Sequence, residues 1–329
     1  MNDKIDAVIL FVDMNDEEWK DGYNKFVEAH EIPNKYINND TRFRDYGSLR
    51  GVLRSIDTYA PWINNLFLVV QRESQVPKWI NRDTVKVVLH EEFIPNEYLP
   101  TYNCNTIETH LHFIPGLSEK FIYFNDDTFL NTVVYPEDFF IGNKCVDTIV
   151  DIEFEKYFSG NVNEKFYKKL RFNNTKVFNE IYKDKHSIYR TIFNSHGPTP
   201  LFKSLCEEIY HKIDMKKHMS PFRTTNNLTQ ELFTIYELLH RRLILLKNAT
   251  KKNKSNNNPY TVYSSKTHEK FKDNFINNMS KTYCINDSFK NDFITDDIFI
   301  IGEVNKIISI RFPNKSKYEK RKSSIMCNR

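Results

Sequence analysis

The sequence predicts an α/β fold in which a mostly parallel sheet is flanked by helices, with helical or irregular insertions. Four short apolar runs rich in β-branched or aromatic residues recur at 5–12, 66–70, 85–89 and 120–124. Between the first two runs, residues 49–56 place apolar side chains at helical spacing. Runs of this length without polar interruption are typical of buried parallel strands. A strand, a helix and a further strand in this order favour a right-handed crossover.

Further helices are predicted at three places. One begins at Glu17, because Trp19, Tyr23 and Phe26 recur at helical spacing after it. A second is expected over residues 106–113, and a third over 229–246, where apolar residues line one side.

These elements predict one domain assembled from three separate parts of the chain. Residues 141–185 lack a clear period and are expected to form an insertion or lid. Residues 248–279 begin with a polar, Lys- and Asn-rich stretch, which is typical of a mobile loop. Residues 319–329 form a basic tail. The three parts of the domain are then 1–140, 186–247 and 280–318.

Length, charge and cysteine content exclude several classes of protein. A chain of 329 residues can bury a large core without disulfides. Its 47 basic and 43 acidic side chains leave a net charge of +4, which is too small for a typical nucleic-acid-binding protein. The five cysteines are scattered without the close pairing of a zinc or redox motif, as expected of reduced cytosolic thiols. With no signal-peptide pattern and no apolar segment of membrane-spanning length, we expect a cytoplasmic protein, and peripheral contact with the inner face of the plasma membrane is left open.

Acidic residues follow two of the predicted strands. Asp13 comes after the first apolar run, and Asn125, Asp126 and Asp127 come directly after the fourth. Ligands gather at the carboxyl ends of strands in open α/β sheets, so both loops are expected to face one crevice. Two adjacent carboxylates can hold a divalent cation that bridges phosphate oxygens. Asn and Asp are also favoured in turns, and the triplet by itself favours a turn.

Four arginines and one histidine are candidates for phosphate binding and proton transfer. Arg42, Arg44 and Arg50 lie within one short window, and Arg223 follows later. Guanidinium groups match the geometry of phosphate, although arginines near a helix start are usually solvated. His196 precedes a Gly-Pro turn, and its near-neutral pKa suits removal of a proton from a hydroxyl group. A loop histidine without a role is the commoner outcome for such a residue considered alone.

Other polar residues are weaker candidates. Glu108 and His110 lie two residues apart, so they do not share one face of a helix. Asn286 and Asp287 form an amide–carboxylate pair that also suits a turn. With eight glycines in the chain and no Gly-rich phosphate loop, P-loop and dinucleotide-fold enzymes are disfavoured.

Taken in order, these segments resemble the Stealth family of capsular polysaccharide phosphotransferases. The family is related to the animal N-acetylglucosamine-1-phosphotransferase, which begins the mannose 6-phosphate tag. The similar segments are 5–13 with Asp16 for the first family region; 42–50, 53–56, 60–62, 77–79, 107–110 and 121–127 for the second; 196–200 with Arg223 for the third; and 284–287 for the fourth. Phe11 stands where the family usually has Trp, and residues 46–48 stand where acidic residues are commoner. The match spans nearly the whole chain.

The resemblance implies a GT-A-like fold, a UDP-sugar donor and a polysaccharide acceptor. Hexose 1-phosphate, expected to be N-acetylhexosamine 1-phosphate, would pass to an acceptor hydroxyl, forming a phosphodiester and releasing UMP. The implied catalytic residues are His196 as general base, with Asp127, Arg223 and Arg44. A Mg²⁺ or Mn²⁺ ion would be held by Asp126, Asp127 and Asp287. Substrate contacts are expected from Asp13, Arg42, Asp45, Arg50, Glu108, His110, Asn125 and Asn286.

Two other functions remain open from the sequence. The same site in an ordinary metal-dependent GT-A glycosyltransferase would direct attack to the anomeric carbon and release UDP. A polysaccharide-binding factor without catalytic activity would suit the 14% aromatic content, although aromatic residues serve core packing more often than sugar stacking. The nucleotide that is released distinguishes the two enzymatic alternatives.

Overall fold

The centre of the computed structural model is a sheet with the strand order β10-β4-β1-β2-β3. The structure describes residues 3–31, 43, 45, 47–147, 149–153, 166–182, 190–194, 197–245, 260–263, 275–277, 280–287 and 294–321. Strands β1 (Ile5–Leu10), β2 (Leu66–Val70), β3 (Val85–Leu89) and β4 (Lys120–Phe124) run parallel. Strand β10 (Thr199–Phe202) pairs antiparallel with β4. The expected fold class is confirmed.

The register of the central strands brings their carboxyl ends to one edge. In β1, Ile9 lies opposite Leu68 of β2 and Phe124 of β4. Strands β1 and β4 are parallel neighbours, so the loops that follow them leave the sheet side by side. The acidic residues predicted to meet at this edge are carried by these two loops.

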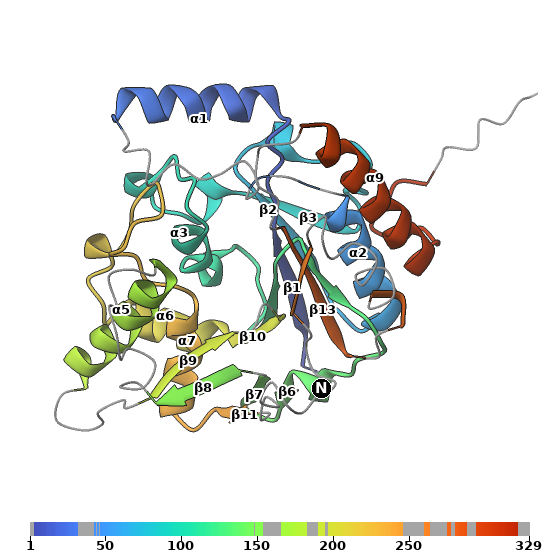
Figure 1. The fold of residues 1–329 in the computed structure, drawn as a ribbon. Helices are drawn as coiled ribbons and strands as arrows, with labels where there is room; N and C mark the ends of the chain where they lie inside the picture. The colour runs from blue at the N-terminus through green and yellow to red at the C-terminus, as the bar shows by residue number, and fades with distance from the viewer. Residues whose placement is uncertain are drawn as a thin grey trace, which may run out of the picture.

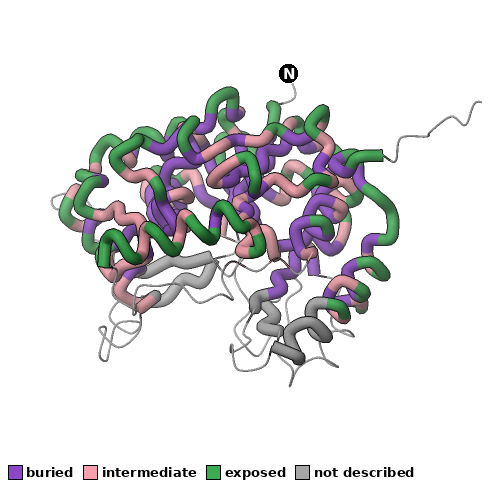
Figure 2. The backbone as a smooth tube through the Cα atoms, turned by 90° about the horizontal axis from the view of Figure 1, so that it is seen from above, coloured by how far each residue is buried: buried purple, intermediate pink, exposed green. Residues whose placement is uncertain are grey.

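Helices cover both faces of the sheet. Figure 1 shows α2 (Ser48–Tyr59) and α9 (Ile294–Arg311) on one side, and α3 (Cys104–Glu108), α6 (Lys203–Tyr210) and α7 (Glu231–Leu239) on the other. The predicted apolar face of α2 is fully buried at Leu49, Val52, Leu53 and Ile56. Gly51 of this helix packs so closely that an added Cβ would meet Phe129 and Ile308. Figure 2 shows buried backbone through the interior and exposed backbone along the outer turns.

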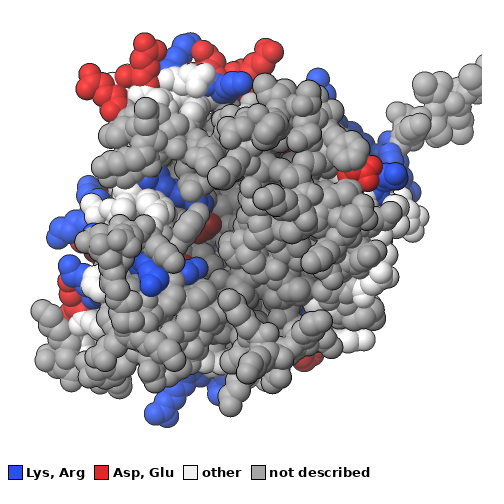
Figure 3. Space-filling view, viewed as in Figure 1, with Lys and Arg blue, Asp and Glu red and all other residues white. Residues whose placement is uncertain are grey.

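Helix α1 (Glu17–Ala29) begins at the predicted residue and rests on a second, smaller apolar cluster. The carboxylate of Asp16 caps it by accepting from the Trp19 backbone N–H at 3.1 Å. Trp19 is buried with Tyr102 and Phe222 in this aromatic cluster. The outer side of α1 carries acidic residues, which Figure 3 shows at the top of the molecule. The amphipathic pattern of the sequence therefore produces a helix that covers aromatic rings.

Three smaller sheets surround the central one in the described part of the chain. One contains β12 (Tyr260–Tyr263), β13 (Thr282–Asp287) and β5 (Thr128–Leu130). The others contain β11 (Leu243–Leu245), β7 (Lys144–Asp147) and β6 (Phe140–Ile141), and β8 (Ile149–Glu153) with β9 (Arg190–Asn194). The 3₁₀ turns are η3 (Glu73–Gln75), η4 (His90–Glu92), η5 (Asn96–Tyr98), η6 (Leu111–Phe113), η7 (Pro136–Asp138) and η9 (Met215–Lys217).

Several predicted boundaries need correction. The first strand ends at Leu10, two residues earlier than expected. The helix expected over 106–113 is divided into α3 and η6, because the Thr109 hydroxyl bonds the carbonyls of Asn105 and Thr106 and competes with the helical pattern. The helix expected over 229–246 stops at Leu239, and β11 follows the left-handed residue Arg241 (φ 57°).

Regular structure also occurs where the sequence showed no period. Residues 141–185 include β7, β8 and α5 (Phe166–Ile181), so part of the expected insertion is helical. The division into domain, lid and loop stays a prediction. The described helices include none with the length and apolar character needed to cross a membrane.

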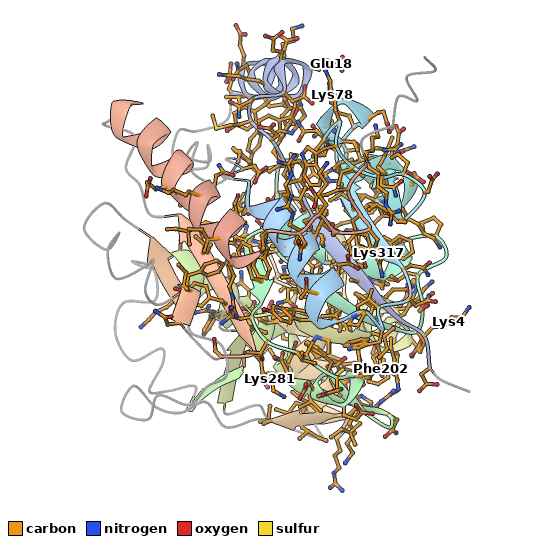
Figure 4. All side chains as sticks on the ribbon, turned by 90° about the vertical axis from the view of Figure 1, so that its right-hand side faces the viewer. Lys4, Glu18, Lys78, Phe202, Lys281 and Lys317 are labelled. Carbon is orange, nitrogen blue, oxygen red and sulfur yellow. The ribbon has the colours of Figure 1, made fainter. Side chains whose placement is uncertain are left out.

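The C-terminal segment is fastened to α2 by an ion pair with little access to water. Arg54 of α2 donates from Nε to Glu319 Oε1 at 2.7 Å and from Nη2 to Oε2 at 2.9 Å. Its Nη1 donates to the carbonyl of Phe312 at 2.7 Å. Burial raises the pKa of Glu319, but the hydrogen bonds from Arg54 and from the Ser316 backbone, together with the charges of Arg54 and Arg50, outweigh this and hold the pKa below its usual value. The segment that carries Lys317 runs along α2 (Figure 4), where its backbone N–H bonds Asp57.

Replacing Arg54 with Ala should destabilise the protein by about 3 kcal/mol, because the nearly buried carboxylate of Glu319 loses its bidentate partner and keeps the more distant Arg50, at 3.5 Å, as its ion-pair partner. Side-chain exposure is 12% for Arg54 and 4% for Glu319. Replacing Arg82 is the matched control, since the Arg82–Glu73 pair is 45% and 66% exposed and should contribute about 1 kcal/mol or less. Midpoints of urea unfolding measure both changes. Equal losses of stability in the Arg54 and Arg82 variants would contradict a special contribution from the Arg54–Glu319 ion pair.

Candidate active site

The loop after β4 is a tight turn that presents two carboxylates. The backbone N–H of Thr128 donates to the carbonyl of Asn125 at 3.1 Å, which closes the turn around Asp126 and Asp127. Strand β5 then begins and pairs with β13, where Cys284 lies opposite Thr128. The backbone N–H of Ile285 donates to the carbonyl of Asp127 at 3.0 Å. A segment from near the end of the chain therefore fixes this turn.

Both carboxyl groups of the turn have raised pKa values. Burial raises the pKa of Asp127 to about 6, although hydrogen bonds from the Cys284 thiol and the Thr128 hydroxyl oppose the shift. The pKa of Asp126 lies well above its usual range, first because of burial and then because of the negative charges of Asp127 and Asp45. These carboxylates are close enough to repel one another, and their charge is poorly solvated.

Asp45 and Asp13 extend this acidic group from two other segments. Asp45 precedes α2, and its Oδ1 accepts from the Ser48 hydroxyl at 3.1 Å. Burial raises the pKa of Asp45, and the charge of Asp13 raises it further. Asp13 lies in the loop after β1. The sheet edge thus gathers the carboxylates of Asp13, Asp45, Asp126 and Asp127.

Gln75 holds the Asp13 loop in place. Its Oε1 accepts from the backbone N–H of Asp13 at 2.8 Å, and its Nε2 donates to the carbonyl of Asp13 at 3.0 Å. The same Nε2 donates to Asp16 Oδ2 at 2.9 Å. Gln75 belongs to η3, which follows β2, so the loops after two adjacent strands are joined.

A second polar group lies on the other side of Asn125. The Tyr123 hydroxyl is 2.5 Å from Asn125 Oδ1 and 3.0 Å from Glu108 Oε1. Burial raises the pKa of Glu108 to about 7, despite the lowering effect of the Arg223 charge. One tyrosine hydrogen cannot serve two acceptors fully, so a neutral Glu108 can donate to Tyr123 while Tyr123 donates to Asn125.

Arg223 provides positive charge beside this group. Its Nη2 contacts the Sγ of Cys104, and its charge acts on both Cys104 and Glu108. Burial raises the pKa of Cys104 to about 11, so this thiol stays protonated at neutral pH. The site therefore combines a cluster of carboxylates, an ionisable glutamate and a guanidinium group.

The structure does not bring two of the predicted substrate contacts to these loops. Arg50 stacks over the ring of Trp79 at 4.5 Å and lies 3.5 Å from Glu319, on the side of α2 that faces the C-terminal segment. His110 is fully buried, and its Nδ1 donates to the carbonyl of Thr106 at 2.6 Å while Nε2 accepts from Tyr210 at 2.9 Å. Both side chains are engaged within the fold, and their substrate contacts stay predictions.

Some predicted residues lie outside what the structure describes. Arg42, Arg44 and His196 are not among the described residues. Asn286 and Asp287 are described only in their backbone, as the end of β13 beyond Cys284. Their roles stay predictions.

Tyr123, Cys104 and Gln75 are functional candidates that the sequence interpretation missed. A signal existed for Tyr123, because alternate residues of a strand point to the same face and Tyr123 precedes Asn125 by two. No comparable signal existed for Cys104 or Gln75, whose partners come from other segments of the chain.

The donor set fits a divalent cation. Hard cations prefer carboxylate oxygens, and a cation between Asp126 and Asp127 would favour the ionised form of two carboxyl groups whose pKa values burial raises. Among the described residues, no group of three or more His, Cys, Asp or Glu side chains is placed so that it could hold a metal ion. Water and substrate phosphates commonly supply the remaining ligands of Mg²⁺.

Comparison with known proteins defines the class of the chain. Residues 42–148 match the family model "Stealth protein CR2, conserved region 2". The receptor polysaccharide phosphotransferase WefC of Streptococcus gordonii is 31% identical over 72% of this chain and 79% of its own length. The capsular polysaccharide phosphotransferase WcwK of Streptococcus pneumoniae is 30% identical over 97% of this chain and 99% of its own length. The chain is thus an enzyme of the sugar-phosphate transferase class. It belongs to the Stealth family of polysaccharide phosphotransferases.

Two solved structures also resemble the chain at low identity. Mouse xyloside xylosyltransferase 1 is 13% identical, with a TM-score of 0.34 over 86% of this chain and 98% of its own. The galactosyltransferase LgtC is 9% identical, with a TM-score of 0.34 over 92% and 95% of the two chains.

Replacing Glu108 with Gln should reveal the raised pKa. A carboxyl group whose folded pKa is about 7 instead of 4.5 stabilises the fold at low pH, and this contribution is lost as the pH rises through 7. The variant cannot ionise, so its stability relative to the native protein should rise by about 3 kcal/mol between pH 4 and pH 8. Urea midpoints across this range measure the difference.

Glu237→Gln provides the control. Burial raises the pKa of Glu237 in α7 to about 8, and this residue bonds the backbone N–H of Phe202 at the opposite end of β4. Its variant should show the same pH trend without a loss of turnover, whereas Glu108→Gln should also lower turnover. A constant stability difference between native protein and Glu108→Gln at all pH values would contradict the raised pKa.

Proposed function

We propose that this enzyme transfers hexose 1-phosphate from a UDP-sugar to a hydroxyl group of a growing capsular or cell-surface polysaccharide. The sugar is expected to be an N-acetylhexosamine. The observation that carries the proposal is the meeting of carboxylates and a guanidinium group at the carboxyl edge of the sheet. Such a site suits a diphosphate, whose charge needs both a cation and an arginine. The names of the related phosphotransferases support the same class of reaction.

The proposed reaction is a substitution at phosphorus. The acceptor oxygen loses its proton to His196 and forms a bond to the phosphorus next to the sugar. The bond from that phosphorus to the bridging oxygen of the diphosphate breaks, and UMP leaves. The bond between the anomeric carbon and its oxygen stays intact, so the product is a phosphodiester that retains the anomeric configuration.

The charged groups have separate proposed tasks. Asp126 and Asp127, together with Asp287, would hold Mg²⁺ or Mn²⁺, which supplies neutralisation of the diphosphate charge when bound. Arg223 and Arg44 would stabilise charge on the phosphoryl group during transfer. The position of Arg223 beside Glu108 and Cys104 supports this assignment.

The remaining polar groups would bind the substrates. Asp13 and Asp45 are proposed to hold the nucleotide part of the donor, and Gln75 keeps the Asp13 loop fixed. Glu108 and Asn125 share the Tyr123 hydroxyl and would contact the sugar or acceptor. Arg42 and Asn286 complete the proposed set of substrate-binding residues.

The state of the cysteines bears on the location of the enzyme. The described cysteines, Cys104, Cys145, Cys206 and Cys284, are free thiols, which supports a cytoplasmic location.

The nucleotide that is released tests the reaction type. Purified enzyme with a panel of UDP-sugars, an oligosaccharide primer and Mg²⁺ should release UMP and give a phosphodiester signal in phosphorus-31 spectra. EDTA should stop the reaction, and Mg²⁺ or Mn²⁺ should restore it. Release of UDP would indicate glycosyl transfer instead, and full activity in EDTA would remove the metal from the proposal.

Replacing His196 with Ala should lower turnover by about 10²–10⁴-fold, which is the usual contribution of a positioned general base. Donor KM should change little, because the base acts on the acceptor hydroxyl. His211→Ala is the control, since His211 is an exposed histidine in the turn after α6. Steady-state kinetics with both variants measure the effect. Unchanged turnover in His196→Ala would show that His196 is not the general base.

A further inference from the structure

The segment that carries Arg223 has no regular structure, yet much of it is buried. It runs from His218 to Gln230, between η9 and α7. Phe222 and Leu228 anchor it in the two apolar clusters. An irregular segment has no hydrogen-bond ladder, so other groups must satisfy its backbone and fix its shape.

Asn227 uses every polar atom of its side chain for this purpose. Its Oδ1 accepts from the backbone N–H of Thr224 at 2.7 Å and from Nδ2 of Asn103 at 3.0 Å. Its Nδ2 donates to the carbonyl of His218 at 2.8 Å and to the hydroxyl of Ser220 at 2.7 Å. The side chain is 1% exposed. One amide therefore ties together the residues on both sides of Arg223.

Asn103 connects this segment to α3. Its Oδ1 accepts from the backbone N–H of Asn105 at 3.1 Å, which caps the helix that carries Cys104 and Glu108. Its Nδ2 lies 3.0 Å from the carbonyl of Ser220 and 3.3 Å from that of Phe222. The contact between Asn103 and Asn227 thus joins the two segments whose side chains meet at Arg223 and Glu108.

We propose that Asn227 is a positioning residue: its four amide hydrogen bonds fix the segment on both sides of Arg223 and so set the guanidinium group beside Cys104 and Glu108. The inference rests on the proposed function, because it assigns Asn227 an effect on turnover through the phosphoryl contact of Arg223. Asn227 touches no substrate. Displacement of a catalytic group by about 1 Å can lower a rate by about 10²-fold, so the alignment of this segment controls the rate.

Asn227→Asp tests this with little change of shape. An aspartate cannot donate to the carbonyl of His218, and its second oxygen would face that carbonyl instead. We expect kcat to fall by about 10-fold to 10²-fold with a smaller change in donor KM. Asn226→Asp is the matched control, because the neighbouring side chain is exposed and receives the same chemical change. It should keep the native kcat.

A double-variant cycle separates positioning from a general loss of structure. If Asn227 acts through Arg223, Asn227→Asp should lower kcat in the native background and cause no further loss in an Arg223→Ala background. Equal losses in both backgrounds, measured well below the melting temperatures of all variants, would overturn the proposal. If Asn227→Asp does not fold, Ser220→Ala removes one acceptor of the same amide and enters the cycle in its place.

Two failures can be told apart. Native turnover in Arg223→Ala would remove the phosphoryl role of Arg223 and the positioning role of Asn227 together. A loss of turnover in Arg223→Ala combined with native turnover in both Asn227→Asp and Ser220→Ala would overturn the positioning role alone and leave the proposed reaction intact.

Discussion

The crowding of partly buried carboxyl groups at the carboxyl ends of β1 and β4 is the constraint on which the site depends. Asp126 is affected by the charges of Asp127 and Asp45, and Asp45 by that of Asp13. Such crowding destabilises a fold unless other groups compensate. The Cys284 thiol and the Thr128 hydroxyl compensate in part. The negative charge that these two groups do not compensate could bind a cation, which could in turn bind phosphate. Carboxyl groups with shifted pKa values are typical of functional sites.

The central sheet was predictable because its strands are encoded locally. The apolar runs at 66–70, 85–89 and 120–124 became β2, β3 and β4 with the expected bounds. Buried parallel strands contain few polar residues, so their ends coincide with a change in composition. The helices predicted over 106–113 and 229–246 came out shorter, because side-chain bonds to the backbone and a left-handed residue interrupt them. Interruptions of this kind do not change the spacing of the apolar residues, so hydrophobic periodicity does not predict them.

The two acidic loops could be placed at one edge from the sequence, since parallel neighbouring strands end there together. The directions in which the Arg50 and His110 side chains point could not be predicted from the sequence. Each lies close in sequence to a proposed site residue, yet each side chain turns to a partner distant in sequence, Glu319 for Arg50 and Tyr210 for His110. Likewise, the segment that carries Arg223 is joined to the residue before α3 by the hydrogen bond between Asn103 and Asn227. Long-range polar pairing of this kind has no period that a single sequence displays.

The pairing of β5 with β13 places a distant part of the chain against the turn of Asp126 and Asp127. On the ribosome, the strands that precede this turn emerge long before residue 284. A nascent chain can therefore complete its parallel strands while its acidic turn still lacks the thiol and backbone partners of β13. The acidic turn therefore reaches its final structure only after β13 has been synthesised and has paired with β5.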